Sequence, residues 1–354
     1  MRYFFSSRLN ELWYFYLRKP AGLLFLLLSQ VLFFVGFHNR AIKHCARSCR
    51  YAESSSSNRL LKKLFDKIGY SHLKFSSGIT LSDATTRSII LKWPDIDGDT
   101  VKSKGILLIT FTKTFSYYLN NTDLNKLHHY FYVVLEPSWS GYADPDILGF
   151  FDSGNKVIIQ SSEMHDRIFL NHFLDHCIPV SFGASDWVNP YICNKTNTEK
   201  IYDSVYIANT NPIKRVLRYL EAVKTIVQTQ DPDYKACLVC AAWGGAETLL
   251  RGLVESFKLE KNLTLLIELK RPQVIEVLNQ SKVNILLSLK EGSNRSLFEA
   301  LFCGVPIILA SENIGVNKSY VNENTGLLLD NNAIENGLLW MKDNHHRYDT
   351  RTWA

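Results

Sequence analysis

Short apolar segments alternate with amphipathic helical segments along most of this chain, and this pattern constrains the fold more than any other feature. Four apolar segments in the first half predict strands, at 104–111, 129–137, 155–161 and 177–183. Five more follow in the second half, at 204–210, 234–242, 262–269, 282–289 and 305–310. Continuously apolar strands that alternate with helices are typical of parallel sheets covered by helices on both faces. The polar segment 189–200 separates the two runs, so the sequence predicts an α/β protein with two Rossmann-like domains.

Length and composition agree with two folded domains. The chain has 354 residues, of which 46% are hydrophobic and 21% are charged, and a usual domain has about 150 residues. This composition excludes a disordered chain, a collagen and a long coiled coil. A mean hydropathy of −0.08 excludes a polytopic membrane protein. Residues 1–50 hold eight basic residues and one acid, whereas the whole chain carries +6, so the rest sums to −1. A nucleic-acid-binding body is therefore disfavoured.

The basic residues of 1–50 surround the only long apolar run, the 17 uncharged residues 21–37. This length is at the short limit for a membrane-spanning helix, and the aromatic residues 13–16 stand where an interfacial belt would lie. Three interpretations remain open: a membrane anchor or in-plane hydrophobic hairpin, a buried helix of the first domain, or a signal peptide, which the long front region disfavours. The Ser-rich segment 51–60 is predicted to link this basic, hydrophobic leader to the body.

The seven cysteines are odd in number and scattered, which does not indicate a disulfide framework. Cys237 and Cys240 fall in an apolar segment that predicts a buried strand. Residues three apart on a strand point to opposite faces, so this pair is poorly placed for a shared metal. We therefore expect a reducing compartment, either the cytoplasm or the cytoplasmic face of a membrane. We expect no metal site and no resident cofactor.

The most informative loop follows the predicted strand 282–289. Glu291 and Gly292 come directly after the strand, and a helix is predicted to start near 293–296. The free amides at a helix start favour an anion such as phosphate, and a glycine lets the backbone approach a ligand closely. Glu299 stands inside this helix, where a carboxylate can accept hydrogen bonds from a ribose diol. Ligands bind at the carboxyl ends of strands in sheets of this kind.

These residues resemble the signature of a known family. The spacing Glu291-x7-Glu299, followed by Ala300 and by 304–306 (Gly-Val-Pro), is similar to that of the GT-B fold, family 4 (group 1) glycosyltransferases. The segment 324–328 (Asn-Thr-Gly-Leu-Leu) and the segment 206–215 also resemble parts of that family's nucleotide-binding domain. The resemblance covers residues 200–354. It implies a GT-B architecture, with two Rossmann-like domains facing a cleft and an N-terminal hydrophobic leader added.

The resemblance implies transfer of a sugar from a nucleotide-sugar donor with retention of configuration. Glu291 would contact the donor sugar, and Lys214 would balance the charge that grows on the diphosphate, which lowers the barrier. These two are the expected catalytic residues. The expected donor-binding residues are Arg215, Gly292, Ser293, Asn294, Arg295, Ser296, Leu297, Glu299 and Lys270. No metal is expected, since a lysine and a helix start can together supply the positive potential that the diphosphate needs. Solvated side chains at helix starts and strand ends are the structural alternative for these positions.

The first body domain, 60–195, is expected to bind the acceptor, which is a glycan, a lipid-linked molecule or another compound. Glu136, Ser138, Trp139 and Tyr142 follow a strong predicted strand and carry groups suited to sugar binding. Asp144 and Asp146 are alternatively helix caps. The segment 110–114 lacks the glycine-rich loop that the family often has there, which puts contacts from this domain to the donor phosphate in doubt. GT-B chains usually end in a helix that returns to the first domain, and the expected C-terminal domain, 200–354, stops before one. Either this helix is missing or the sequence is truncated.

The sequence thus predicts a metal-independent glycosyltransferase of polysaccharide biosynthesis, associated with a membrane. Its partners are a nucleotide sugar, an acceptor glycan or lipid-linked acceptor, and a membrane surface, with no nucleic acid. Two alternatives remain: a non-catalytic GT-B relative that binds a glycan or a partner, and a GT-B sugar epimerase.

Overall fold

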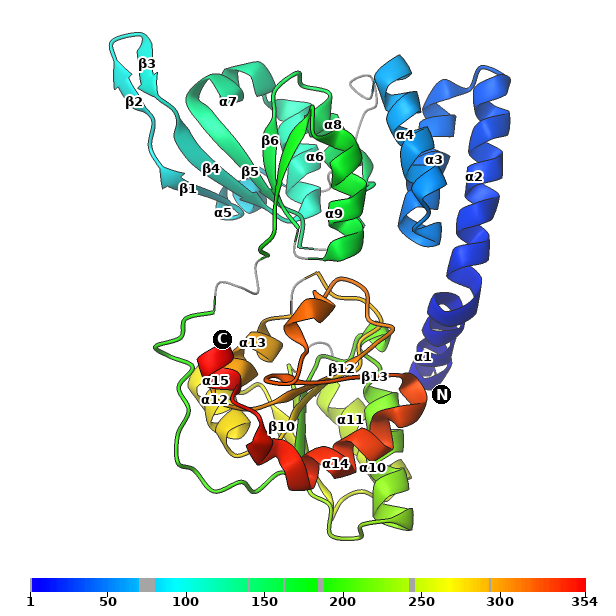
Figure 1. Cartoon of the computed structure of the whole chain (residues 1–354), viewed down its shortest axis with the longest axis vertical. Helices are drawn as coiled ribbons and strands as arrows, with labels where there is room; N and C mark the ends of the chain where they lie inside the picture. The colour runs from blue at the N-terminus through cyan, green and yellow to red at the C-terminus, as the bar shows by residue number, and fades with distance from the viewer. Residues whose placement is uncertain are drawn as a thin grey trace. The chain divides into compact units, whose positions relative to one another are not determined.

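The computed structural model describes residues 2–69, 80–138, 141–161, 163–183, 188–241, 246–292 and 294–354 (Figure 1). The chain divides into two compact units. The N-terminal unit is Trp13–Ala184, and the C-terminal unit combines Ser185–Ala354 with Met1–Leu12. Residues 2–12 therefore belong with the C-terminal unit, although the sequence interpretation treated 1–50 as a single leader.

The C-terminal unit is built on a sheet whose pairings are all parallel. Its strands are β8 (Ser204–Ile207), β9 (Ala236–Cys240), β10 (Leu263–Ile267), β11 (Asn284–Leu286), β12 (Ile307–Ala310) and β13 (Gly326–Leu329). The strand order is β10-β9-β8-β11-β12-β13. This is the dinucleotide-fold order 3-2-1-4-5-6, in which the connections diverge between the first and fourth strands. The divergence point lies between β8 and β11, so the loops after these two strands should hold a ligand.

Two groups of helices cover this sheet. The helices are α10 (Val216–Thr229), α11 (Ala246–Phe257), α12 (Arg271–Asn279), α13 (Arg295–Phe302), α14 (Ile334–Asn344) and α15 (Thr350–Trp353), with the short turns η4 (Pro212–Lys214), η5 (Lys318–Tyr320), η6 (Asn331–Ala333) and η7 (His345–Arg347). α10 contacts α11 and α14, whereas α13 contacts α12 and α15, and α13 and α14 lie on opposite sides of the sheet (Figure 1). α1 (Arg2–Leu12) packs on η4.

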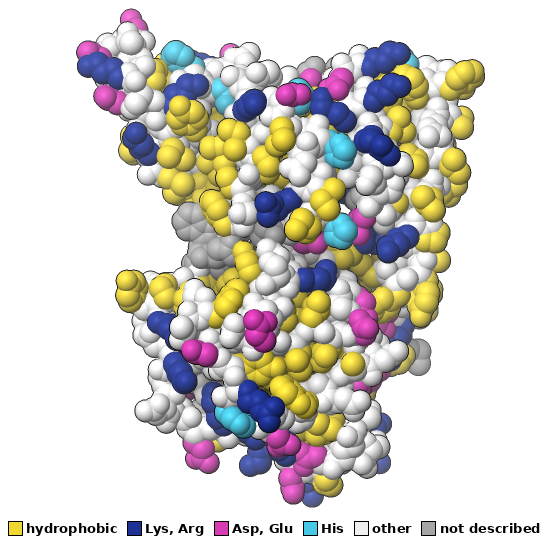
Figure 2. Space-filling model, viewed as in Figure 1, with side chains coloured by type: hydrophobic (Ala, Val, Ile, Leu, Met, Phe, Trp, Pro, Cys, Tyr) yellow, Lys and Arg dark blue, Asp and Glu magenta, His cyan; other side chains and the backbone are white. Residues whose placement is uncertain are grey.

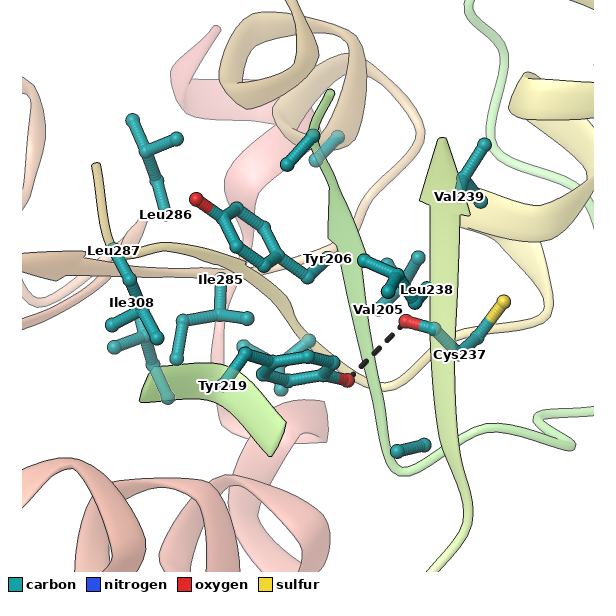
Figure 3. Packing of buried hydrophobic residues seen from close by; sticks show 14 of the residues in the cluster. Val205, Tyr206, Tyr219, Cys237, Leu238, Val239, Ile285, Leu286, Leu287 and Ile308 are labelled. Carbon is teal, nitrogen blue, oxygen red and sulfur yellow. Dashed lines mark hydrogen bonds between the residues drawn. The ribbon is translucent and has the colours of Figure 1, made fainter. Parts of the chain in front are cut away.

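The core of this unit includes two fully buried tyrosines whose hydroxyls have defined partners. Tyr206 of β8 packs edge-on against Tyr219 of α10, with the two ring centroids 5.4 Å apart. The Tyr219 hydroxyl donates to the Cys237 carbonyl at 3.3 Å (Figure 3). Buried tyrosines need such partners because an unsatisfied hydroxyl is costly inside a protein. These bonds tie α10 to β8 and β9 beneath the loops that carry the site.

The N-terminal unit has a smaller sheet with one antiparallel edge. Its strands are β1 (Ser88–Lys92), β4 (Gly105–Thr110), β5 (Phe131–Glu136), β6 (Val157–Gln160) and β7 (Cys177–Val180). The order is β1-β4-β5-β6-β7, with β1 antiparallel to β4 and the other pairs parallel. A separate hairpin of β2 (Asp95–Asp97) and β3 (Thr100–Ser103), which the sequence interpretation missed, precedes β4. The helices are α5 (Leu81–Thr86), α6 (Thr112–Asn121), α7 (Leu124–Tyr130), α8 (Pro145–Phe151), α9 (Met164–Leu170) and η2 (Asn171–Phe173).

The N-terminal unit also contains helices that come before the sheet. They are the π-helical turn η1 (Trp13–Leu17), α2 (Arg18–Phe34), α3 (His38–Ala52) and α4 (Ser55–Ile68). The predicted linker at 51–60 is wrong, because α4 begins inside it. The Ser54 side chain caps α4 by accepting from the Ser57 amide, a role in which serine is favoured. Leu61 and Phe65 then bury α4 in the core of the unit.

Residues 2–34 form one helix of 33 residues that is long and apolar enough to cross a membrane, and among the described residues it alone passes this test. The predicted fold class is confirmed, since both units are α/β with mainly parallel sheets typical of the GT-B fold. The predicted strand at 129–137 is shorter than expected, because residues 129 and 130 complete α7.

Candidate functional site

Lys214 and Glu291 meet where the connections of the C-terminal sheet diverge. Lys214 ends the turn η4 after β8, and Glu291 lies in the loop after β11. The Lys214 ammonium Nζ lies 2.6 Å from both carboxylate oxygens of Glu291. The Glu291 side chain is 6% exposed and that of Lys214 is 20% exposed. Two residues that are 77 positions apart in the sequence thus form one nearly buried ion pair.

Backbone hydrogen bonds hold this ion pair in place. The Leu289 amide donates to the Ile213 carbonyl at 2.9 Å, which joins the loop after β11 to the turn after β8. The Glu291 amide donates to the Ile314 carbonyl at 2.8 Å. The buried Tyr206 hydroxyl donates to the Lys214 carbonyl. The loops that carry the two charges are therefore fixed by the sheet rather than by the ion pair alone.

A cavity of about 290 Å³ opens beside Lys214. Its walls come from the carboxyl ends of β8, β9 and β10 and from the start of α12, and they include Asn209, Cys240, Glu268 and Val274. Small-molecule sites are typically concave and mostly apolar with a few placed polar groups. This cavity has that character, and its cation is Lys214.

Arg215 does not join Lys214 at this cavity. Arg215 follows Lys214 and has a left-handed backbone conformation, with φ of 54°. Its side chain turns inward, and the whole residue is 1% exposed. Its guanidinium donates to the Glu11 carboxylate at 2.9 Å, to the Asn331 side chain and to the Leu287 carbonyl at 3.4 Å. These contacts indicate that Arg215 fixes the turn that presents Lys214. Glu11 was missed because the sequence interpretation assigned residues 1–50 to a leader.

The start of α13 follows the sequence expectation in outline. Asn294 is the cap residue, and its side chain accepts from the Leu297 amide at 3.2 Å and from the Ser296 hydroxyl at 2.7 Å. The Leu297 amide is therefore already bonded to the cap. Arg295 is exposed and Gly292 is half-buried. Ser293 lies outside the described residues. The other first-turn amides have no intrahelical acceptor, as at any helix start.

Glu299 forms a second buried charge contact in this unit. It is 6% exposed as a residue and lies 3.2 Å from the Arg271 guanidinium of α12. Burial raises the pKa of Glu299, and the Arg271 and Arg295 charges oppose this shift. Lys270, the predicted donor contact, is exposed, and its backbone amide donates to the Gln273 side chain at 2.9 Å. Arg271, its neighbour, is thus the residue that the tertiary structure brings to Glu299.

In the N-terminal unit, Glu136 and Ser138 meet at the carboxyl end of β5. Glu136 is buried, and its two oxygens accept from the Ser138 amide at 2.8 Å and from the Ser138 hydroxyl at 2.7 Å. Burial raises the pKa of Glu136, and the hydrogen bonds from Ser138 oppose the shift. Ser138 has a φ of 60°, which is uncommon for a non-glycine residue and costs some strain. The Glu136 carboxylate therefore fixes the position of Ser138 directly after β5.

The remaining predicted acceptor residues lie differently. Tyr142 belongs to the buried core, and its hydroxyl donates to the Gln160 carbonyl. Trp139 lies outside the described residues. Asp144 caps α8 by accepting from the Asp146 amide at 3.0 Å, as the sequence alternative held. All seven cysteines are buried and free. Among the described residues, no group of three or more His, Cys, Asp or Glu side chains is placed to hold a metal ion.

Comparison with known proteins supports the family resemblance. Residues 193–350 match the family model described as Glycosyl transferases group 1. Three solved structures are similar to this chain. S. aureus TarM is 16% identical with a TM-score of 0.53, and the match covers 69% of this chain and 50% of that chain. Sucrose-phosphate synthase from Thermosynechococcus elongatus is 15% identical with a TM-score of 0.53, covering 69% and 66%. Anabaena HepE is 12% identical with a TM-score of 0.51, covering 69% and 71%.

The comparison with curated proteins gave no match. This chain spans about half the length of TarM. At these identities the solved structures show the fold, and they confirm the predicted architecture. The resemblance to the group 1 glycosyltransferases is confirmed for residues 193–350, which contain Lys214, Glu291 and Glu299.

Proposed function

Because residues 193–350 match the group 1 glycosyltransferases, we propose that this chain transfers a sugar from a nucleotide-diphosphate sugar to an acceptor, with retention of anomeric configuration. The observation that carries the proposal is the Lys214–Glu291 ion pair at the divergence point of the sheet, beside the cavity that Lys214 lines. Nucleotides bind at this point in sheets with this strand order.

Lys214 is the cation for the donor diphosphate. Negative charge grows on the leaving diphosphate as its bond to the sugar breaks, and a fixed cation lowers the barrier most when it faces that charge. Lys214 is held by bonds to its carbonyl and by Glu291, so it needs little reorganisation. A placed lysine supplies this stabilisation without a metal ion, so metal independence stays part of the proposal.

Glu291 has two roles in this proposal. It keeps the Lys214 ammonium in place in the free protein, and it presents carboxylate oxygens to the hydroxyl groups of the donor sugar. Glu299 would accept from the ribose hydroxyls, with Arg271 keeping its charge balanced.

Uridine diphosphate is the donor nucleotide that we propose. Relatives of this fold have been solved with it: the structure of TarM holds UDP, and that of HepE holds UDP-glucose. The walls of the cavity beside Lys214 include Val274 near the start of α12 and Cys240 at the end of β9, which gives the base an apolar surface. Three further points stay predictions. They are a glycan or lipid-linked acceptor, a role in polysaccharide biosynthesis, and a location in the cytoplasm or at the cytoplasmic face of a membrane.

Calorimetric titration with UDP tests the donor site. We expect the full chain to bind UDP and Lys214→Ala to bind at least about tenfold more weakly, since a charge-assisted hydrogen bond contributes about 1.5–3 kcal/mol. Lys261→Ala is the matched control, because Lys261 is an exposed lysine just before the amino end of β10, whereas the cavity lies at the carboxyl ends of the strands. Equal weakening in both variants would mean that only general charge is lost.

Product analysis with a panel of UDP-sugars separates the alternatives. A transferase releases UDP and forms a glycoside when an acceptor is present, whereas an epimerase changes the sugar with no acceptor. A chain that binds UDP and turns over no UDP-sugar favours the non-catalytic relative. Absence of UDP binding in the unmodified chain overturns the nucleotide assignment.

A further inference from the structure

Helix α2 buries small residues and leaves several large apolar side chains exposed. Gly22 and Ser29 are buried, and Ser29 is 0% exposed. By contrast, Leu24 is 65% exposed and Phe34 is 91% exposed. A helix on the surface of a water-soluble domain normally turns its apolar stripe towards the core and its polar side outward. The outward side of α2 instead forms an apolar stripe, which we define as Leu23, Leu24, Leu27, Val31, Phe34 and Val35.

The inner side of α2 packs on α3 through small residues. A Cβ atom at Gly22 would lie 2.4 Å from the Ala52 amide nitrogen, so only glycine allows this approach. The Ser29 hydroxyl donates to the Ala41 carbonyl at 2.7 Å. Close contact through small residues and hydroxyl-to-backbone hydrogen bonds is typical of helix pairs in lipid. Lipid tails are as apolar as leucine, so burying a leucine between two helices there brings no hydrophobic stabilisation.

The partner helix α3 belongs firmly to the N-terminal unit. Its residues Ile42, Cys45 and Cys49 are part of the hydrophobic core. At the start of α2, the buried Arg18 forms an ion pair with Glu53 and also donates to the Arg50 carbonyl. The helix α2 is therefore fixed along the surface of a folded unit. Crossing a bilayer alone would break the Arg18 ion pair and the contacts to α3.

Cations lie against aromatic rings of α2 and of the turn that follows it. The Arg47 guanidinium lies 5.7 Å from the centre of the Phe25 ring, and the Lys67 ammonium lies 5.0 Å from that of Phe33. The Arg40 guanidinium lies 5.6 Å from the Phe37 ring at the turn between α2 and α3. The segment 13–52 contains six Lys or Arg residues and no Asp or Glu. Side chains of this kind reach from an apolar surface to the level of lipid phosphates.

We propose that the apolar stripe of α2 docks on an anionic lipid bilayer, with the helix in the plane of the interface. Hydrophobic side chains gather along the edge of the molecule that α2 forms (Figure 2), and they would enter the headgroup and acyl boundary. The cations Arg40, Arg47 and Lys67 favour an anionic bilayer over a second copy of the chain. A two-fold pairing through the stripe would bring the same cations of both copies together, whereas lipid phosphates neutralise them.

Flotation of the full chain with vesicles tests the proposal. We expect binding to phosphatidylcholine vesicles that contain phosphatidylglycerol, and weaker binding to phosphatidylcholine alone or at high salt. The variant Leu24→Ser/Leu27→Ser/Val31→Ser should bind at least about tenfold more weakly, because buried apolar area sets the affinity. The matched control is Leu81→Ser/Ile89→Ser/Leu91→Ser, which changes exposed apolar residues of α5 and β1 in the same unit.

Circular dichroism and UDP titration separate a docking defect from misfolding and from loss of the donor site. The α2 variant should keep the helical signal and the UDP affinity of the unmodified chain. Loss of vesicle binding in both triple variants, or no binding by the unmodified chain, overturns the proposal. The proposal is also overturned if the unmodified chain sediments as a dimer and does not bind vesicles, while the α2 variant sediments as a monomer.

Discussion

Each unit of the molecule buries a glutamate after a parallel strand, yet the two carboxylates have different kinds of partner. Glu291 in the C-terminal unit is paired with Lys214, a residue that comes from the loop of another strand. Glu136 in the N-terminal unit accepts two hydrogen bonds from Ser138, only two positions away. The first carboxylate joins distant segments, whereas the second shapes its own loop.

This difference indicates where the charge chemistry of the molecule lies. An ion pair between two loops places a cation and an anion beside the cavity, where a diphosphate and sugar hydroxyls need both. The Glu136 carboxylate already accepts two hydrogen bonds from Ser138, so fewer of its acceptor sites are left for a ligand. The comparison therefore supports the proposal that donor chemistry lies in the C-terminal unit. It predicts that losing a charge pair between distant segments lowers activity or stability more than losing a local contact does.

The largest expected effect distinguishes the two glutamates directly. Glu291→Gln removes the anion that holds Lys214, and we expect UDP release from a UDP-sugar to fall about 10²- to 10³-fold, the usual loss for a placed electrostatic group. Glu136→Gln keeps the shape of the side chain and should change this rate by less than about threefold. Initial rates of UDP release measure both. Similar losses in the two variants would break the comparison.

A second long-range pair should dominate the stability of the C-terminal unit. Glu11→Ala leaves the buried Arg215 guanidinium without its carboxylate, and we expect a loss of about 3 kcal/mol in the free energy of unfolding. Glu221→Ala is the control, since Glu221 pairs with Arg8 in a contact that is more exposed and should lose less than about 1 kcal/mol. Urea unfolding measures both. Equal losses would show that Arg215 does not depend on Glu11.

A smaller effect is expected from a local carboxylate of the N-terminal unit. Burial raises the pKa of Asp146 from 3.8 to about 6. The folded chain thus holds this proton more tightly than the unfolded chain, so stability falls as pH rises from about 4 to about 6 and stays lower above. Asp146→Asn should abolish this fall and stabilise the chain by up to about 2 kcal/mol at neutral pH. Urea unfolding across this pH range is the measurement, and an unchanged pH profile would contradict it.

The smallest expected effect concerns the second charge pair of the donor side. Glu299→Gln should weaken UDP binding by about tenfold, because an amide is a poorer acceptor for ribose hydroxyls and leaves Arg271 unpaired. Glu276→Gln changes an exposed glutamate of α12 and should leave the affinity unaltered. Calorimetry with UDP compares them. Unaltered affinity in Glu299→Gln would restrict the donor contacts to the Lys214 cavity.

Sequence patterns predicted the elements of the C-terminal unit closely. β8 and β9 fall inside the predicted segments 204–210 and 234–242, and α13 starts at Arg295, within the predicted 293–296. Continuous apolar strands and amphipathic helices depend on local periodicity, so a sequence reveals them directly. The Ser-rich segment was misread, since serines at 54–57 serve both turns and helix caps. Only the apolar residues that follow, such as Leu61 and Phe65, decide for a helix.

The site was predicted only in part for a physical reason. Residues that share one loop, such as Glu291 and Asn294, keep their relation in any fold that forms the loop. Arg215 stands next to Lys214 in the chain, yet its left-handed backbone turns the side chain inward to Glu11. No spacing rule connects positions 11 and 215. The partner of Glu299 was likewise hidden, because Arg271 approaches it from another helix.

The sequence by itself determined the α/β class, the two runs of strands, the basic character of 1–50 and the motif around Glu291, since each depends on neighbours in the chain. The tertiary structure decided which charges meet, because ion pairs form wherever packing brings segments together. It also decided that the leucines of α2 face outward while Gly22 and Ser29 face α3. An apolar run alone is compatible with a core helix or a membrane span. Only the packing of its small residues against α3 shows which side of the helix faces outward.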